Sequence, residues 1–295
     1  MERRNFLLAA AGSAVAVDTL LSAAAPDTAE PRLHIALNSF AANVLYTRDK
    51  ANYLDNLAEL KDAGIDGIEL SLNTANDLQK TVQRLNDAGM QYRSVYTSAN
   101  LHDEAAAGKE IDRLVQLGSK MKELGSRFIC FNAAAKHGKS DAELIRQSQN
   151  IDKTGKELAA LGITLALHYH TTELEFGGRE FVHILNGTDP KHLTLCLEEH
   201  WSYRGCGNSQ VALFDHLKLY ADRVSMVHLR QSSANVWSES FGDGDIDNVK
   251  LSAELKRLNR PLLFVLEQCS ESGTPKTLTA KELFRRSAEY VRKVF

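Results

Sequence analysis

Two histidines and two glutamates crowd the segment LHYHTTELEF, residues 167–176. His168 and His170 end an apolar run, and Glu173 and Glu175 follow within a few residues. Because alternate residues of a strand point to one side, both histidines can face the same pocket. Imidazole and carboxylate groups bind divalent metals and also exchange protons. The segment therefore indicates either a strand that reaches the surface and turns polar, or one side of a metal site.

Polar residues of the same kinds follow several other apolar runs. They are Glu69, His102, Glu198, Glu199, His200, Trp201, His228, Arg230, Glu267 and Gln268. Any one of them alone would more often be a loop contact, but an unpaired carboxylate is costly to bury. A divalent cation shared by carboxylates and histidines offsets that cost. Mixed ligation of this kind favours zinc, manganese, cobalt or iron over calcium or magnesium.

The elements that must position these residues form a repeating pattern. Eight apolar runs favour strands, at 33–40, 65–72, 91–97, 127–133, 163–170, 193–200, 224–231 and 261–268. The apolar spacing between them is helical, and glycines such as Gly64 and Gly162 precede the next strand as helix caps would. Eight strand–helix units predict an α/β fold, a single-domain (β/α)₈ TIM barrel, whose active residues lie at the C-terminal ends of the strands. A doubly wound sheet is the rival, but no G-x-G-x-x-G follows the first strand.

The N-terminus has the order of an export signal. Arg3 and Arg4 precede an apolar run, and Ser22-Ala23-Ala24 offers a cleavage site. The run is too short to span a membrane, and the paired arginines favour a twin-arginine signal. We therefore predict a signal over residues 1–25, a barrel over 26–295, and a periplasmic or secreted protein with no membrane segment in its mature form. The alternative is an ordinary amphipathic N-terminal helix.

Charge and cysteine usage narrow the function classes. The 295-residue chain has a net charge of −3 and no basic stripe, so it lacks the electrostatic footprint of a nucleic-acid binder. A small, roughly neutral substrate suits this balance better. Cys130, Cys196 and Cys269 lie within predicted strands, where cysteine behaves as a small hydrophobic residue, and no disulfide framework is expected.

An ordered set of segments resembles a known family. LALHYHTTELEF, LCLEEHWSYRGCG, VSMVHLR, FGDGDID and FVLEQ are similar to segments of the xylose-isomerase-like TIM barrels called sugar phosphate isomerases/epimerases, particularly an exported branch. The resemblance covers essentially the whole mature chain. It implies one divalent metal ion, of manganese, zinc, cobalt or iron, held from strands five to eight by His168, Glu198, His228 and Glu267.

The chain departs from the family at some of these positions. His168 replaces the usual glutamate of strand five, which in the epimerases is also one of two opposed acid/base groups. Glu198 replaces an aspartate, and Arg230 and Gln231 replace a lysine and an aspartate after the strand-seven histidine. A strict copy of the epimerase mechanism is therefore in doubt.

The GDGDID loop has two interpretations. Asp243, Asp245, Asp247 and Glu254 match the spacing of calcium-loop ligands, but Asn248 stands where the sharp turn needs glycine. A loop that leads into a helix, with an aspartate at the helix start, is the simpler prediction.

These observations favour a metal-dependent isomerase or epimerase that acts on a small carbohydrate, a sugar or keto-sugar, through an enediolate. Glu267 is predicted to be both ligand and base, and His170 to exchange the second proton. The residues expected to contact substrate are Glu69, His102, Glu173, Trp201 and Arg230. Glu173 is alternatively expected to orient one of the histidines. A homo-oligomer is compatible with this prediction.

Other function classes remain open at this stage. The lost strand-five glutamate makes a keto-sugar lyase, dehydratase or hydratase a serious alternative. A sugar-binding barrel without catalysis is the alternative of another class, since two ligand positions are substituted. The related DNA-repair endonucleases need a cluster of zinc ligands that strands two to four do not supply, and a basic groove that is absent.

Overall fold

Eight parallel strands close into a barrel in this computed structural model, which describes residues 32–72, 75 and 78–295. The strands follow one another around the barrel in the order β1-β2-β3-β4-β5-β6-β7-β10, and β10 pairs with β1. Their bounds are β1 Ile35–Asn38, β2 Gly67–Ser71, β3 Gln91–Ala99, β4 Phe128–Ala133, β5 Thr164–His168, β6 Thr194–Glu198, β7 Val224–Leu229 and β10 Leu263–Leu266. All eight predicted strands are confirmed, and so is the (β/α)₈ TIM barrel, a single domain.

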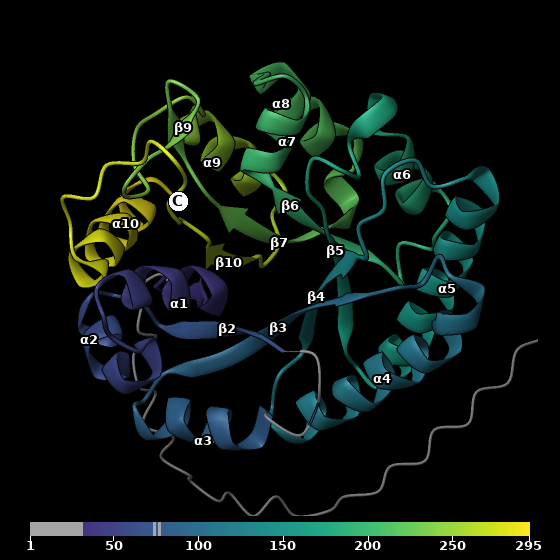
Figure 1. The fold of residues 1–295 in the computed structure, drawn as a ribbon, viewed down its shortest axis with the longest axis horizontal. Coiled ribbons are helices and arrows are strands. Elements are labelled where there is room, and N and C mark those ends of the chain that lie inside the picture. Colours follow the sequence, from purple (N-terminus) through teal and green to yellow (C-terminus); the bar gives the residue numbers. More distant parts are fainter. Residues whose placement is uncertain (1–31, 73–74, 76–77) are drawn as a thin grey trace, which may run out of the picture. The chain divides into compact units, whose positions relative to one another are not determined.

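Helices surround the strands on the outside (Figure 1). Their bounds are α1 Ser39–Arg48, α2 Leu57–Asp62, α3 Leu78–Asp87, α4 Glu104–Glu123, α5 Asp141–Ala160, α6 Glu175–Asn186, α7 Glu199–Gly205, α8 Gln210–Leu219, α9 Asn248–Arg257 and α10 Ala280–Val294. Short 3₁₀ turns lie at Tyr53–Asn56 and Ala221–Arg223, and β8 Ser232–Ser233 pairs with β9 Val236–Trp237 in a small hairpin. No helix in the described ranges has the length and apolar character needed to cross a membrane.

Local sequence signals account for the helix boundaries. Ser140 forms a capping box with Glu143 at the start of α5, and its side chain accepts from the Glu143 backbone N–H. Gly64 and Gly162 follow helix ends with φ of 95° and 77°, a left-handed conformation that glycine adopts without strain. The helices α2 and α5 therefore stop just before the strands β2 and β5 begin.

The barrel interior changes character along each strand. A cluster of small or apolar side chains fills the middle of the barrel: Ala36, Cys130, Ala166, Cys196, Met226, Leu263 and Val265. Two residues further along β5, β6, β7 and β10 the inward side chains are polar: His168, Glu198, His228 and Glu267. Because residues two apart in a strand share a side, the polar set lies above the apolar set toward the C-terminal ends. We call these sets the polar layer and the apolar layer.

The GDGDID loop behaves as a strand-to-helix connection. Asp247 is the N-cap of α9, and its side chain accepts from the Lys250 backbone N–H at 2.9 Å. Asp245 accepts from the Ser232 hydroxyl and the Ala234 and Asn235 backbone N–H groups, which fixes the β8–β9 hairpin. The aspartate predicted at the helix start is confirmed.

Two predictions fall partly or wholly beyond what the structure describes. The export signal over residues 1–25 lies outside the described residues. The predicted barrel domain begins at residue 26, of which the structure describes the chain from residue 32. Residues 33–295 form one unit.

Candidate metal and sugar site

Four side chains meet at the C-terminal end of the barrel. His168, Glu198, His228 and Glu267 each offer one ligand atom, and these atoms lie within 4.8 Å of one another. They come from β5, β6, β7 and the residue that follows β10, and all four are buried. The four residues assigned to a metal from the sequence are therefore brought together around one point.

The hydrogen bonding of this cluster tests whether it suits a cation. His168 Nε2 lies 3.0 Å and His228 Nδ1 lies 2.9 Å from the same oxygen, Glu198 Oε1. Neither approach is a hydrogen bond, so both nitrogens are buried without a partner, as is His168 Nδ1. Buried polar atoms are normally satisfied, and exceptions require an explanation. Two histidines and two carboxylates whose donor atoms converge unsatisfied fit a divalent cation of the transition series.

Glu69 lies behind His228 rather than in the open pocket. Its carboxylate oxygen Oε1 is 3.1 Å from His228 Nε2, on the side of the ring opposite Glu198. Asn38 Nδ2 and the Ser94 hydroxyl donate to the two oxygens of Glu69, each at 2.9 Å. A carboxylate on the far nitrogen of a ligating histidine fixes the ring orientation and raises its basicity. Glu69 is therefore placed to hold His228.

Burial and charge push the ionisable groups of the cluster in different directions. Burial and the neighbouring His170 lower the pKa of His168 well below its usual value, so its imidazole is neutral and offers a lone pair. Burial opposes charge on His228 as well, but the carboxylates of Glu198 and Glu69 outweigh it and raise its pKa. The carboxylates thus favour positive charge at the centre of the site.

The two carboxylates of the cluster also differ. Burial raises the pKa of Glu198 to about 7, against the opposing effect of His228. Burial acts on Glu267 in the same sense, but the Arg230 guanidinium outweighs it and holds the pKa of Glu267 well below its usual value. Glu267 is the carboxylate that stays ionised and can accept a proton.

Arg230 is held by an ion pair, by hydrogen bonds and by two aromatic rings. Its Nη2 lies 2.8 Å from Glu267 Oε2, its Nε donates to the Glu267 carbonyl, and its backbone N–H donates to Glu199 Oε1. The guanidinium carbon lies 4.1 Å from the ring centre of Trp237 and 5.3 Å from that of Trp201. A guanidinium this close to aromatic rings is held by cation–π attraction. Arg230 therefore serves to neutralise and orient Glu267.

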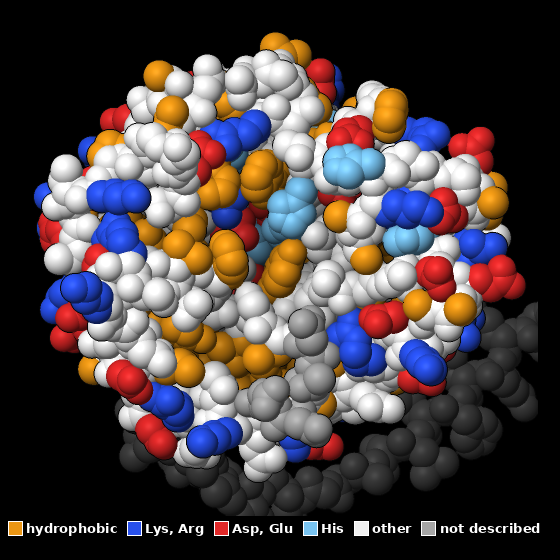
Figure 2. Space-filling model, in the orientation of Figure 1, with side chains coloured by type: hydrophobic (Ala, Val, Ile, Leu, Met, Phe, Trp, Pro, Cys, Tyr) orange, Lys and Arg blue, Asp and Glu red, His pale blue; other side chains and the backbone are white. Residues whose placement is uncertain are grey.

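A cavity of about 280 Å³ opens above the cluster. Its lining residues are Asn38, Phe40, Ser71, Tyr96, His170, Trp201, Arg230, Trp237 and Glu267. Figure 2 shows this face of the molecule hollowed at its centre, with histidine and hydrophobic side chains around the opening. The volume lies just below the usual range for small-molecule pockets and suits a ligand the size of one sugar ring.

His170 faces the pocket although it lies beyond the end of β5. Its ring centre is 4.7 Å from that of His168 and 5.3 Å from that of Trp201. Tyr169 between the histidines is fully buried on the other side, against Phe181. The alternation expected of a strand thus continues for two residues past its last hydrogen bond.

Glu173 stabilises the loop that carries His170. Its Oε2 accepts from the His170 backbone N–H at 2.8 Å, and its Oε1 accepts from Asn132 Nδ2 at 3.2 Å. Asn132 Oδ1 in turn accepts from the Tyr96 hydroxyl at 3.3 Å. Glu173 is 1% exposed and does not line the cavity, so it positions His170 through the backbone.

The pocket contains some of the predicted substrate contacts and not others. Trp201 and Arg230 line it, whereas Glu69, His102 and Glu173 do not. His102 lies in the loop before α4, where its carbonyl accepts from Arg146 of α5 at 3.1 Å. Glu175, from the opening segment, pairs with His137 at 2.9 Å near the surface. Glu199 and His200, assigned to a strand end, instead begin α7.

Several residues around the site were not found from the sequence. Asn38 is the last residue of β1, and the same rule of strand ends that found Glu69 would have identified it. Tyr96 lies within β3. Trp237 lies in the β8–β9 hairpin, whose position depends on the hydrogen bonds that the Asp245 carboxylate accepts. No local signal in the sequence places Trp237 near Arg230.

Solved structures of similar fold are known. A sugar phosphate isomerase/epimerase from Parabacteroides distasonis has a TM-score of 0.72 and 16% identity, over 91% of this chain and 96% of that one. D-allulose 3-epimerase from a Methylomonas species, in complex with D-allulose, has a TM-score of 0.70 and 18% identity, over 90% and 98%. The 3-keto-D-glucoside 4-epimerase YcjR from E. coli has a TM-score of 0.66 and 16% identity, over 89% and 100%. At these identities the likeness shows the fold.

The sequence itself carries the family signal. A comparison with curated proteins finds no match. The sequence profile of the family described as "Xylose isomerase-like TIM barrel" matches residues 57–294, most of the chain and every strand from β2 to β10. This chain therefore belongs to the xylose isomerase-like TIM barrel family.

Proposed function

We propose that this protein is a divalent-metal-dependent isomerase or epimerase that acts on a sugar or keto-sugar through an enediolate. The observation that carries the proposal is the convergence of His168, Glu198, His228 and Glu267 beside a pocket that both Glu267 and His170 line. The similar structures named for sugar isomerases and epimerases support the same class.

The residues have separate roles in the proposed reaction. When bound, a divalent cation supplies Lewis acidity that acidifies a carbon-bound proton next to a carbonyl. The Glu267 carboxylate takes that proton, because Arg230 keeps it ionised. His170 in its protonated form gives its proton to the enediolate carbon and becomes neutral, and its position on another part of the pocket wall allows delivery to a different face. His168, Glu198, His228 and Glu267 would hold the cation.

The pocket favours a sugar without a phosphate group. Arg230 is the one cationic side chain among its lining residues, and it is already paired with Glu267. A phosphate would have to compete with Glu267 for the same guanidinium. The aromatic rings of Tyr96, Trp201 and Trp237 instead offer apolar faces to a sugar ring. Export through the proposed signal over residues 1–25 is compatible with such a substrate.

One observation favours a second candidate, elimination or hydration of a keto-sugar. Among the described residues that line the pocket, Glu267 is the one carboxylate, since strand five ends in His168 where a second carboxylate would oppose it. An enediolate formed by a single carboxylate base can expel a β-hydroxyl or glycoside, with His170 protonating the leaving oxygen, instead of being reprotonated on carbon. The product distinguishes this lyase, dehydratase or hydratase from the epimerase.

The test is proton exchange in deuterated water. Protein reconstituted separately with manganese, zinc, cobalt or iron is mixed with a panel of ketoses and keto-glycosides, each with and without phosphate, and followed by NMR. We expect deuterium at the carbon next to the carbonyl of an unphosphorylated sugar, dependent on metal. A product that keeps every substituent supports the epimerase, and loss of a β-substituent supports the lyase.

The same experiment can overturn the proposal. Metal-replete protein that exchanges no proton and eliminates no group from any sugar would indicate a barrel that binds sugar without catalysis. Protein that retains no metal from any of the four solutions would remove the metal-dependent mechanism.

A further inference from the structure

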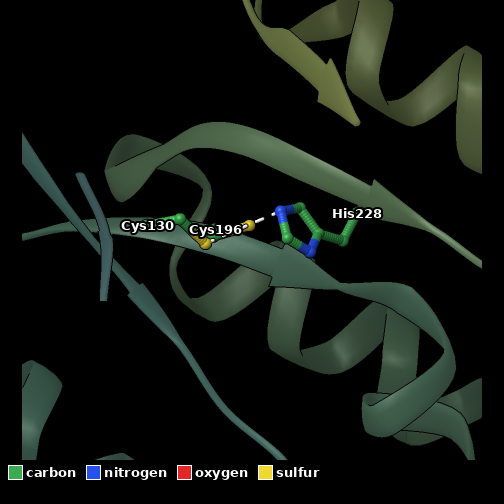
Figure 3. A group of neighbouring side chains, drawn as sticks. All are labelled: Cys130, Cys196 and His228. Carbon is green, nitrogen blue, oxygen red and sulfur yellow. Dashed lines mark hydrogen bonds between the residues drawn. The ribbon is translucent and has the colours of Figure 1, made fainter. Parts of the chain in front are cut away.

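A second group of potential ligands lies beneath the polar layer. Cys130 of β4 and Cys196 of β6 approach the Nε2 side of His228, and the three ligand atoms lie within 4.8 Å of one another (Figure 3). Cys130 Sγ is 3.6 Å from His228 Nε2. All three residues are buried, and both thiols are free. We call these three residues the thiol cluster.

One spacing in the thiol cluster, that between Cys130 Sγ and His228 Nε2, fits a tetrahedral ion. A cation about 2.3 Å from a cysteine sulfur and about 2.0 Å from a histidine nitrogen separates the two by roughly 3.5 Å at the tetrahedral angle. The observed separation of Cys130 Sγ and His228 Nε2 is 3.6 Å. Glu198 Oε1, at 3.6 Å from Cys196 Sγ, places a carboxylate beside the same cluster.

The ligand types differ from those of the polar layer. Two sulfur atoms select soft or borderline cations such as zinc, cadmium or copper(I), whereas imidazole and carboxylate groups alone also accept manganese and iron. Each thiol gives up its proton as the cation takes its place, because the thiolate is the form that binds a metal. Both protons then pass to solvent, and the cation neutralises the two thiolates.

We propose that Cys130, Cys196 and the Nε2 atom of His228 form a second, thiophilic metal site that shares His228 with the polar layer. This inference goes beyond the proposed sugar chemistry and does not depend on it. His228 presents Nδ1 to Glu198 and Nε2 to the thiols, so the two sites use opposite edges of one ring.

Sharing one ring couples the two sites. Glu69 Oε1 lies 3.1 Å from the same Nε2 atom that a cation at the thiol cluster would occupy. Occupying the thiol cluster therefore removes the contact through which Glu69 holds His228 and requires the ring to lose its second proton. An excess of a soft cation should therefore inhibit the reaction proposed for the polar layer.

The other reading is that both cysteines only fill space. They pack with Ala36, Ala166 and Met226 in the apolar layer, where cysteine commonly serves as a small hydrophobic residue. Metal stoichiometry and thiolate spectroscopy separate the two readings, because a packing residue binds no cation.

The experiment titrates full-length apo-protein with zinc and with cobalt(II). We expect two zinc equivalents per chain, and in the cobalt protein a thiolate-to-metal charge-transfer band in the near ultraviolet. Cys130→Ala and Cys196→Ala should each lose one equivalent and the band. Cys206→Ala is the matched control, since this half-buried thiol lies outside the cluster, and it should keep both.

A further variant separates this proposal from the proposed function. His168→Ala should lose the equivalent held by the polar layer and keep the thiolate band, since His168 is not in the thiol cluster. Wild-type protein that binds cobalt without a thiolate band, or whose zinc stoichiometry is unchanged in Cys130→Ala and Cys196→Ala, would overturn the second site whatever the fate of the first. A band that survives both Cys130→Ala and Cys196→Ala, or that disappears in Cys206→Ala, would overturn it as well.

Discussion

Both layers of the barrel interior draw on β5, β6, β7 and β10, and most of their neighbouring side chains differ in chemistry. Neighbouring members of the layers are Ala166 and His168, Cys196 and Glu198, Met226 and His228, and Val265 and Glu267. Two residues of strand cover about 6.6 Å. Over that distance the interior passes from side chains that fill volume to side chains with buried atoms that lack hydrogen-bond partners.

This difference indicates that the apolar layer stabilises the fold and that the polar layer forms the candidate site. The apolar layer follows the ordinary rule that buried side chains are small or apolar. The polar layer breaks that rule at four adjacent positions, and burying its unsatisfied nitrogens costs folding free energy. Local violations of folding rules are expected where a site is built. The polar layer is therefore where substitutions should cost activity rather than stability.

The largest expected effect is that of Glu267→Gln. The change keeps the shape of the side chain but removes both the proposed base and the charge that pairs with Arg230. We expect sugar-dependent proton exchange to fall by about 10⁴-fold, the upper range for a proton-transferring group. Steady-state kinetics with the substrate found by NMR measures this loss. Exchange within tenfold of wild type would exclude Glu267 as the base.

His170→Ala should have the next largest effect. His170 lines the pocket but does not belong to the group of four ligand atoms. We therefore expect the variant to bind metal with unchanged stoichiometry while exchange slows by about 10²–10⁴-fold. Metal analysis and NMR exchange on the same sample check both parts. Loss of the bound metal in this variant would make His170 a ligand instead of an acid/base group.

Much of this interior could be predicted from the sequence because both layers obey the period of a strand. The eight apolar runs place His168, Glu198, His228 and Glu267 at corresponding strand ends, and a closed parallel barrel brings such ends together. The role of Glu69 behind His228 could not be predicted, because it depends on which way one carboxylate turns inside the barrel. The position of Trp237 depends on long-range hydrogen bonds of the β8–β9 hairpin, and these cannot be predicted from the spacing of apolar residues in a strand or helix.

Glu69→Gln tests the support behind the polar layer. Glu69 does not line the pocket, yet it lies 3.1 Å from His228 Nε2 and is held by Asn38 and Ser94. Losing such a carboxylate lowers metal affinity by about 10–100-fold. We expect a change at the lower end of that range, because glutamine keeps an oxygen that can accept from the ring. Chelator competition measures the affinity, and an unchanged value would reduce Glu69 to a packing role.

The smallest effect is expected in the apolar layer, from Met226→Leu. Met226 precedes His228 by two residues on β7 and is fully buried beside Cys196, its partner in the strand pairing. Methionine and leucine have similar volumes, so the exchange should cost less than about 1.5 kcal/mol of unfolding free energy. Because Met226 offers no ligand atom to the polar layer, proton exchange and metal stoichiometry should match wild type. Thermal unfolding and NMR exchange measure the two quantities on one preparation. A Met226→Leu variant that keeps its stability but loses proton exchange or bound metal would show that the apolar layer shapes the site directly, and the separation of the two layers would fail.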